Sequence, residues 1–144
     1  MHKLNEIYYF IEDFNSKEIK FLDTKISIIY RNYKKKVDLK LLKKIKKFCI
    51  KEKRKLYISN NVKVAIKLGL NGVYIPSFNK LCNFKNLNTN QSFKIIGSCH
   101  NIMELKNKEN QGCSEIFISP IFKMEKSNYY LGINKFNLMA NNSF

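Results

Sequence analysis

Side chains that can do chemistry gather directly after one apolar run of the chain. The run that ends at Ile96 is followed within four residues by Ser98, Cys99 and His100. A histidine can move a proton near neutral pH, and a serine hydroxyl can hydrogen-bond a substrate oxygen. The stretch is therefore a candidate reactive loop, and Cys99 is the one cysteine placed for reactivity. A structural alternative stays open, in which His100 caps the next helix or is held in a structural hydrogen bond.

The elements around this stretch must position these side chains. A polar helical segment follows His100, Gly112 ends it, and a second apolar run covers Ile116–Ile118. This order predicts a βαβ unit with parallel strands and a right-handed crossover, in which reactive groups collect where each strand ends. Ser119 opens the next such loop. The stretch Lys55–Ser77 repeats the order, which favours a repeated α/β architecture.

Apolar periodicity along the chain predicts six strands with helices between them. The expected strands are Ile7–Ile11, Lys25–Tyr30, Leu56–Ile58, Val73–Ile75, Lys94–Ile96 and Ile116–Ile118. The expected helices are Ser16–Leu22 with Ser16 as cap, Leu39–Lys53 with Asp38 as cap, Val62–Leu68, Met103–Gln111 and Ile133–Met139. We expect one α/β domain over residues 1–144, an incomplete (β/α)8 TIM-barrel-like fold. A doubly wound sheet is the alternative, but no GxGxxG or P-loop motif follows a strand.

Composition limits the class of protein. The chain has 144 residues, of which 44% are hydrophobic, so we expect a folded domain. No apolar run approaches about 18 residues, so we expect no membrane span. The N-terminal residues do not have the pattern of a signal peptide, so we expect a cytoplasmic protein. The four cysteines have no metal-knuckle spacing, which favours small buried residues in a reducing compartment.

The net charge of +16 is the usual sign of a nucleic-acid partner. Here lysine accounts for nearly all of it, since arginine occurs only at Arg31 and Arg54, and asparagine is abundant too. Such a composition is typical of an AT-rich genome, and the lysines of Leu39–Lys53 fit a solvated helix exterior. We therefore expect no nucleic-acid partner, and the same field favours an anionic small molecule.

Three stretches resemble one family, thiamine phosphate synthase and its TenI relatives. Leu56–Ile75, LYISNNVKVAIKLGLNGVYI, is similar to the family's LIINDxVDLALxLGADGVHL. Ile95–Phe122 resembles the family's IIGVSCHNxEEAxxAxxxGADYIxxGPIF. Ile29–Tyr33 stands where the family has Gln-x-Arg-x-Lys. The resemblance implies a (β/α)8 barrel, and the family continues for two more βα units, so we expect a C-terminally truncated domain.

The resemblance implies a reaction and its ligands. The family's synthase joins hydroxymethylpyrimidine diphosphate to thiazole phosphate and releases pyrophosphate with the help of Mg²⁺. Phosphorylated thiamine precursors are therefore the expected partners. Arg31 matches the family's diphosphate arginine, and Lys34 lies beside the position of the family's lysine. An arginine at the rim of the sheet is the alternative for Arg31.

Two asparagines stand where the family binds magnesium. Ser59-Asn60 matches the family's Asn-Asp after the third strand, and Asn79 falls near its second magnesium aspartate. The resemblance thus implies Asn60 and Asn79 as metal ligands and Ser59 and Asn60 as substrate ligands. A neutral amide is a weaker ligand for Mg²⁺ than a carboxylate.

The resemblance also implies roles for the second half of the chain. Ser98 and His100 match the family's Ser-x-His, and in the TenI branch this histidine resembles the acid/base of a metal-free thiazole tautomerase. Ser119 matches the start of Gly-Pro-Ile-Phe, and Lys126 lies near a phosphate-contacting loop. An exposed lysine without a ligand is the alternative for Lys126.

Three functions remain open from the sequence. The first is a thiamine phosphate synthase-like transferase of thiamine biosynthesis, and the second is a TenI-like tautomerase that uses His100. The third is a catalytically degenerate basic binding module. Because the first and last strands would be open edges, we also expect an oligomer or partner that covers them.

Overall fold

The computed structural model describes residues 6–81, 84 and 86–143, and it divides into two compact units, residues 1–73 and 74–144. In the described residues six strands follow one another in a sheet in chain order, β1-β2-β3-β4-β5-β6. Parallel pairing joins β1 to β2, β2 to β3, and β5 to β6. Parallel strands in this order with helices between them are the architecture of an incomplete TIM-barrel-like fold. The fold class predicted from the sequence is therefore confirmed.

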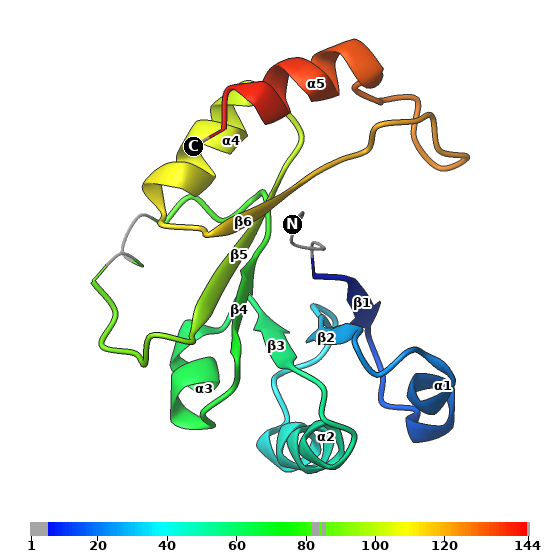
Figure 1. Cartoon of the computed structure of the whole chain (residues 1–144), viewed down its shortest axis with the longest axis vertical. Coiled ribbons are helices and arrows are strands. Elements are labelled where there is room, and N and C mark those ends of the chain that lie inside the picture. Colours follow the sequence, from blue (N-terminus) through cyan, green and yellow to red (C-terminus); the bar gives the residue numbers. More distant parts are fainter. Residues whose placement is uncertain (1–5, 82–83, 85, 144) are drawn as a thin grey trace, which may run out of the picture. The chain divides into compact units, whose positions relative to one another are not determined.

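The first unit alternates strands and helices along the chain (Figure 1). Its elements are β1 (Tyr8–Ile11), α1 (Ser16–Phe21), β2 (Ser27–Tyr30), α2 (Leu39–Lys51), β3 (Leu56–Ser59) and α3 (Val62–Lys67). Strands β2 and β3 are buried along their whole length, as expected for parallel strands covered on both faces. Helix α2 begins where predicted, because the Asp38 side chain accepts the N–H groups of Lys40 and Leu41.

A buried arginine joins the helix and turn that precede β2 in this unit. Arg54 is 5% exposed, and its guanidinium donates to the carbonyls of Ile19, Leu22, Asp23 and Ile26. Two of these carbonyls lie in the last turn of α1 or at its C-cap, where a helix leaves acceptors unsatisfied. Arg54 therefore has a structural role.

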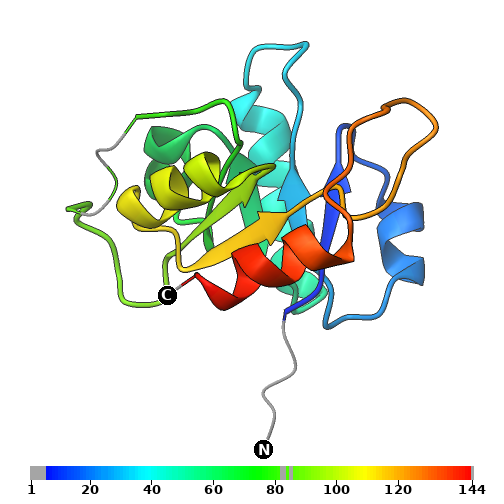
Figure 2. The same ribbon diagram turned by 90° about the horizontal axis from the view of Figure 1, so that it is seen from above.

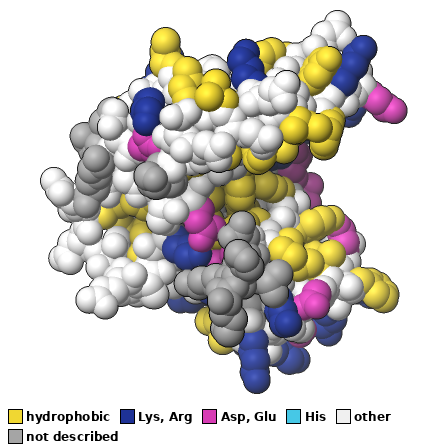
Figure 3. All heavy atoms as spheres, turned by 45° about the horizontal axis from the view of Figure 1, so that its top comes forward, with side chains coloured by type: hydrophobic (Ala, Val, Ile, Leu, Met, Phe, Trp, Pro, Cys, Tyr) yellow, Lys and Arg dark blue, Asp and Glu magenta, His cyan; other side chains and the backbone are white. Residues whose placement is uncertain are grey.

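The second unit contains β5 (Lys94–Cys99), α4 (Ile102–Asn110), β6 (Glu115–Ile118) and α5 (Ile133–Asn141). The strand β4 (Gly72–Ile75) spans the boundary between the units. Figure 2 shows α5, in red, alongside β6, and a core of Cys99, Leu105, Leu131 and Met139 packs there against Ile116 and Ile118. Exposed apolar side chains also occur in this unit, and Figure 3 shows a group of them in yellow in the upper part of the view.

Most element boundaries differ from the prediction by one or two residues, and two differences change the interpretation of particular residues. Strand β5 runs to Cys99 and not to Ile96, so Ser98 and Cys99 belong to the strand and not to the loop after it. Helix α1 is capped by Asn15, whose Oδ1 accepts from Lys17 and Glu18, and not by Ser16. Both residue types are good caps, and pattern alone does not choose between neighbours.

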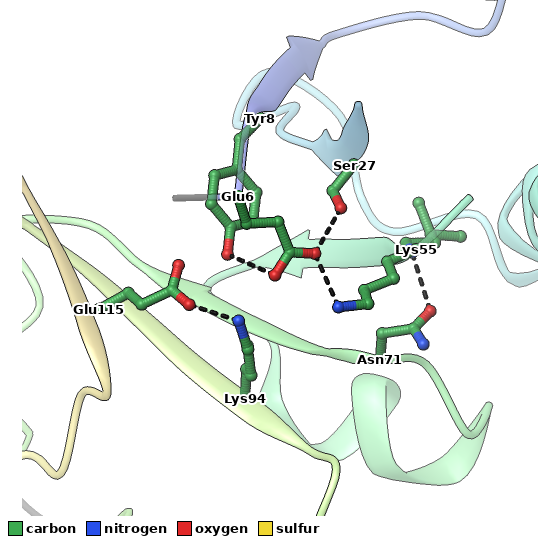
Figure 4. Close-up of polar contacts among 8 residues, drawn as sticks. Glu6, Tyr8, Ser27, Lys55, Asn71, Lys94 and Glu115 are labelled. Carbon is green, nitrogen blue, oxygen red and sulfur yellow. Dashed lines mark hydrogen bonds and ion pairs between the residues drawn. The ribbon is translucent and has the colours of Figure 1, made fainter. Parts of the chain in front are cut away.

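In each unit, charged and polar side chains pair where the strands begin, the end opposite the predicted reactive loops (Figure 4). In the first unit the carboxylate of Glu6 accepts from the hydroxyls of Tyr8 and Ser27 and pairs with Lys55 Nζ at 2.9 Å. In the second unit Lys94 pairs with Glu115. These side chains form hydrogen bonds and ion pairs with one another, so we assign this end of each unit a role in stability.

Among the described residues, no helix is long and apolar enough to cross a bilayer.

Candidate functional site

His100 follows β5 directly, and its ring is held in one orientation. Its Nδ1 lies 2.6 Å from the carbonyl oxygen of Ser119, the residue that follows β6. A carbonyl oxygen only accepts, so Nδ1 carries the proton and donates it. In the neutral ring Nε2 is then the nitrogen that can accept a proton. The Nδ1 hydrogen bond persists when Nε2 is protonated, so the ring needs no reorientation during a proton transfer.

The backbone around His100 is fixed by the start of α4. The side chain of Asn101 caps this helix by accepting from the N–H of Glu104 at 2.9 Å. Glu104 in turn accepts the N–H of His100 at 2.7 Å through Oε2. This reciprocal pair resembles a capping box and sets the direction in which the chain leaves β5. It also places a carboxylate next to His100.

The loop after β6 folds back to His100. The hydroxyl of Tyr129 donates to the His100 carbonyl at 2.7 Å, and the N–H groups of Leu131 and Gly132 donate to Pro120 and Ile121. Figure 2 shows this loop, in orange, extending from the end of β6. Lys126 lies within it and is exposed, so its ammonium is available to an anion. The loop after β6 therefore carries both the exposed Lys126 and Tyr129, which holds the backbone of His100.

Two predicted site residues of this unit are buried in the sheet. Ser98 is 6% exposed and its Oγ accepts from the Tyr74 hydroxyl at 2.8 Å. Cys99 is buried, and burial raises the pKa of its thiol to about 11. A thiol with that pKa is protonated at neutral pH and is a poor nucleophile. His100 is therefore the candidate reactive group of this stretch.

The first unit carries the other predicted residues at the ends of β2 and β3. The guanidinium of Arg31 lies 4.5 Å over the Phe10 ring, a cation–π contact. Ser59 Oγ is 2.6 Å from the Tyr33 hydroxyl. Lys34 pairs with Glu12 at 3.7 Å, and both side chains are exposed. Exposed pairs of this kind are weak, so Lys34 can exchange its partner for another anion.

Comparison with known proteins identifies the family. The family model described as thiamine monophosphate synthase matches residues 20–142. The chain belongs to this family. A search of curated proteins finds no match in sequence.

A solved structure similar to this one is a thiamine phosphate pyrophosphorylase from Pyrococcus furiosus. The TM-score is 0.63, with 13% sequence identity, over 96% of this chain and 71% of the other. At that identity the similarity supports the fold. The resemblance stated from the motifs of Leu56–Ile75 and Ile95–Phe122 is confirmed by the family match.

Magnesium is implied by the synthases of this family, and the residues here do not fit it. Asn79 Oδ1 accepts the N–H of Leu81 at 2.9 Å, and Asn60 is an exposed neutral amide with φ of 56°. The described residues contain no group of three or more His, Cys, Asp and Glu that could hold a metal ion. Mg²⁺ prefers several hard oxygen ligands, commonly carboxylates. We therefore derive no step through a metal.

The buried ammonium group of Lys108, on α4, binds the loop that follows β4. Lys108 is 0% exposed, and its Nζ donates to the carbonyls of Pro76 and Asn79 and to Gln111 Oε1, at 2.8, 2.7 and 2.8 Å. Gln111 Nε2 donates to the carbonyls of Asn79 and Leu81. These side chains of α4 and its C-cap fix the loop that carries Asn79.

Sequence reasoning missed the residues that surround His100. The Asn101-x-x-Glu104 spacing of a capping box could have been found, because it is a local signal. No local signal exists for Tyr129, which reaches His100 from 29 residues away. Lys108 and Gln111 are also missed, because their acceptors are backbone carbonyls of a loop far away in the sequence.

Proposed function

We propose that this protein acts in thiamine phosphate biosynthesis on a phosphorylated thiazole, and that His100 catalyses a proton transfer on it. The observation that carries the proposal is the Nδ1 hydrogen bond to the Ser119 carbonyl, which leaves Nε2 as a base. Family membership supports the substrate class. His100 removes a proton from one atom of the substrate and returns it to another, so substrate and product are isomers.

The phosphate of such a substrate needs cations and donors. Lys126 is exposed on the loop that Tyr129 anchors to His100, and Lys123 is exposed on the same loop. Ser119 belongs to the same loop. Lys123 and Lys126 supply positive charge and Ser119 a hydroxyl, all without a metal, which agrees with the poor fit of Asn60 and Asn79 to Mg²⁺.

The test compares His100→Ala with Tyr129→Phe in the isomerisation of a thiazole carboxylate phosphate. Losing the general base should lower kcat by about 100-fold or more, with KM nearly unchanged. Tyr129→Phe removes only the hydrogen bond to the His100 carbonyl and should cost far less. If His100→Ala keeps the wild-type kcat, the proposal is wrong.

The family match favours a second candidate, the synthase reaction. In it a transferase joins hydroxymethylpyrimidine diphosphate to thiazole phosphate and releases pyrophosphate. Arg31, partly exposed at the end of β2, and Ser59 are the groups of the first unit that this reaction would use. Purified protein with both substrates should form thiamine phosphate, with and without added Mg²⁺, if this candidate holds. Absence of product above background removes it and leaves the proton transfer untouched.

A further inference from the structure

We propose that the outer face of α2 binds the phosphate backbone of nucleic acid without reading its sequence. The face consists of Lys40, Lys43, Lys47 and Lys51, called the lysine stripe below. These residues are spaced by three or four positions, so they lie on one side of the helix. All four are exposed, whereas Leu42, Ile45 and Cys49 on the opposite side are buried.

Within the part of the chain that the structure describes, the stripe has no ion-pair partner. None of the four ammonium groups forms a hydrogen bond with a described residue either. The neighbouring lysines of α2 are engaged: Lys46 donates to the Leu68 carbonyl at 2.6 Å, and Lys44 lies 5.8 Å over the Phe14 ring. Like charges at these spacings repel one another, so an external polyanion that binds them relieves a cost.

The concentration of lysines on α2 exceeds what composition explains. Helix α2 has six lysines and no acidic residue, whereas α4 has two lysines and two glutamates, and Lys106 is paired with Glu109. Residues 1–73 hold 19 of the 27 Lys and Arg and 7 of the 11 Asp and Glu, so their net charge is +12, whereas that of residues 74–144 is +4. An AT-rich genome would enrich lysine on every exposed helix alike. The distribution therefore departs from the expectation that the charge is only compositional.

The shape and chemistry of the stripe favour nucleic acid over a membrane. From Lys40 to Lys51 the helix rises about 16 Å, long enough to follow several successive phosphates. Most apolar side chains of α2 point to the core; the exposed ones are Leu39 at its first residue, 36% exposed, and Ile50 at the margin of the stripe, 65% exposed. The stripe contains no arginine to read guanine and no aromatic ring to stack on a base. We therefore expect sequence-independent binding, at least as tight to a duplex as to a single strand.

The test measures fluorescence anisotropy of a labelled duplex DNA of arbitrary sequence, with NaCl from about 50 to 200 mM. Wild-type protein should bind at low salt. The variant with Lys40, Lys43, Lys47 and Lys51 changed to Gln should bind at least tenfold more weakly. Its slope of log Kd against log salt should be smaller by about three to four, one released counterion per lost contact.

The control variant has the same net charge as the variant that lacks the stripe, but it keeps the four stripe lysines. It changes Lys17, Lys20, Lys63 and Lys67, exposed lysines of α1 and α3, to Gln. This variant should bind within about threefold of wild type and keep most of its salt slope. An equal loss in both variants would show that only diffuse charge acts, and absence of wild-type binding at low salt would overturn the proposal. Binding to anionic phospholipid vesicles in preference to DNA would also overturn it. His100→Ala should bind DNA like wild type, which separates this proposal from the enzymatic one.

Discussion

At the scale of single residues, environment decides which side chains are reactive. Cys99 and His100 are neighbours in the sequence, yet the thiol is buried with a pKa of about 11 while the imidazole is half-buried and keeps one nitrogen as an acceptor. His100 is therefore the candidate for the chemistry proposed at this stretch. The sequence predicted His100 as a candidate, but the Ser119 carbonyl that selects its tautomer lies 19 residues away and could not be predicted from any local pattern.

The buried thiols predict how stability changes with pH. Burial raises the pKa values of Cys49, Cys99 and Cys113 from 9.0 to about 11. A pKa that is higher in the folded state gives stability that is complete below pH 9.0 and is lost as the pH rises through about 11. The Tm should fall over this interval. The fall should be shallower in a variant with these three cysteines changed to alanine, and an identical slope would contradict the assignment.

At the scale of elements, local pattern predicted the units that local interactions build. The cap at Asp38 and the apolar spacing of Leu42, Ile45 and Cys49 were enough to predict α2. The predicted end of β5 was wrong, because a serine such as Ser98 is typical of a loop. In the structure its hydroxyl is buried in the sheet and accepts a hydrogen bond from the Tyr74 hydroxyl, 24 residues away. Lys108 was unpredictable for the same reason, since its acceptors belong to the loop after β4.

The buried ammonium of Lys108 predicts a large loss of stability when it is removed. In Lys108→Met the carbonyls of Pro76 and Asn79 lose a charged donor inside the protein, which should cost about 3 kcal/mol in the free energy of unfolding. Hydrogen exchange at Leu81 should accelerate, since the loop loses its anchor. Urea denaturation measures the loss.

The matched control for this change is Lys106→Met on the same helix. Lys106 is exposed and pairs with Glu109 at 2.9 Å, so its removal should change stability by less than about 0.5 kcal/mol. Similar losses in the two variants would refute a special role for the buried lysine.

At the scale of the whole molecule, charge dominates the behaviour of the protein. A net charge of +16 on 144 residues produces self-repulsion that salt screens. Raising NaCl from about 20 to 500 mM should therefore increase the Tm. The variant with the lysine stripe changed to Gln should show a smaller increase. A Tm that falls with NaCl in the wild type would contradict this view of its electrostatics.

The family and the fold of the whole chain were predictable, because the motifs of two βα units have characteristic spacings. Three expectations stay predictions. They are that the chain is a single domain, that an oligomer covers the strand edges, and that the protein is cytoplasmic. The oligomer and the location depend on other molecules and on the cell, which spacing within one chain does not encode.

The central claim is that His100 moves a proton on a phosphorylated thiazole without a metal. Proton NMR of thiazole carboxylate phosphate, incubated with the wild-type protein in D2O and EDTA, tests it most directly. We expect isomerisation with uptake of solvent deuterium by the wild type, and neither process with His100→Ala. Unchanged substrate with the wild type, or equal turnover by the variant, would contradict it.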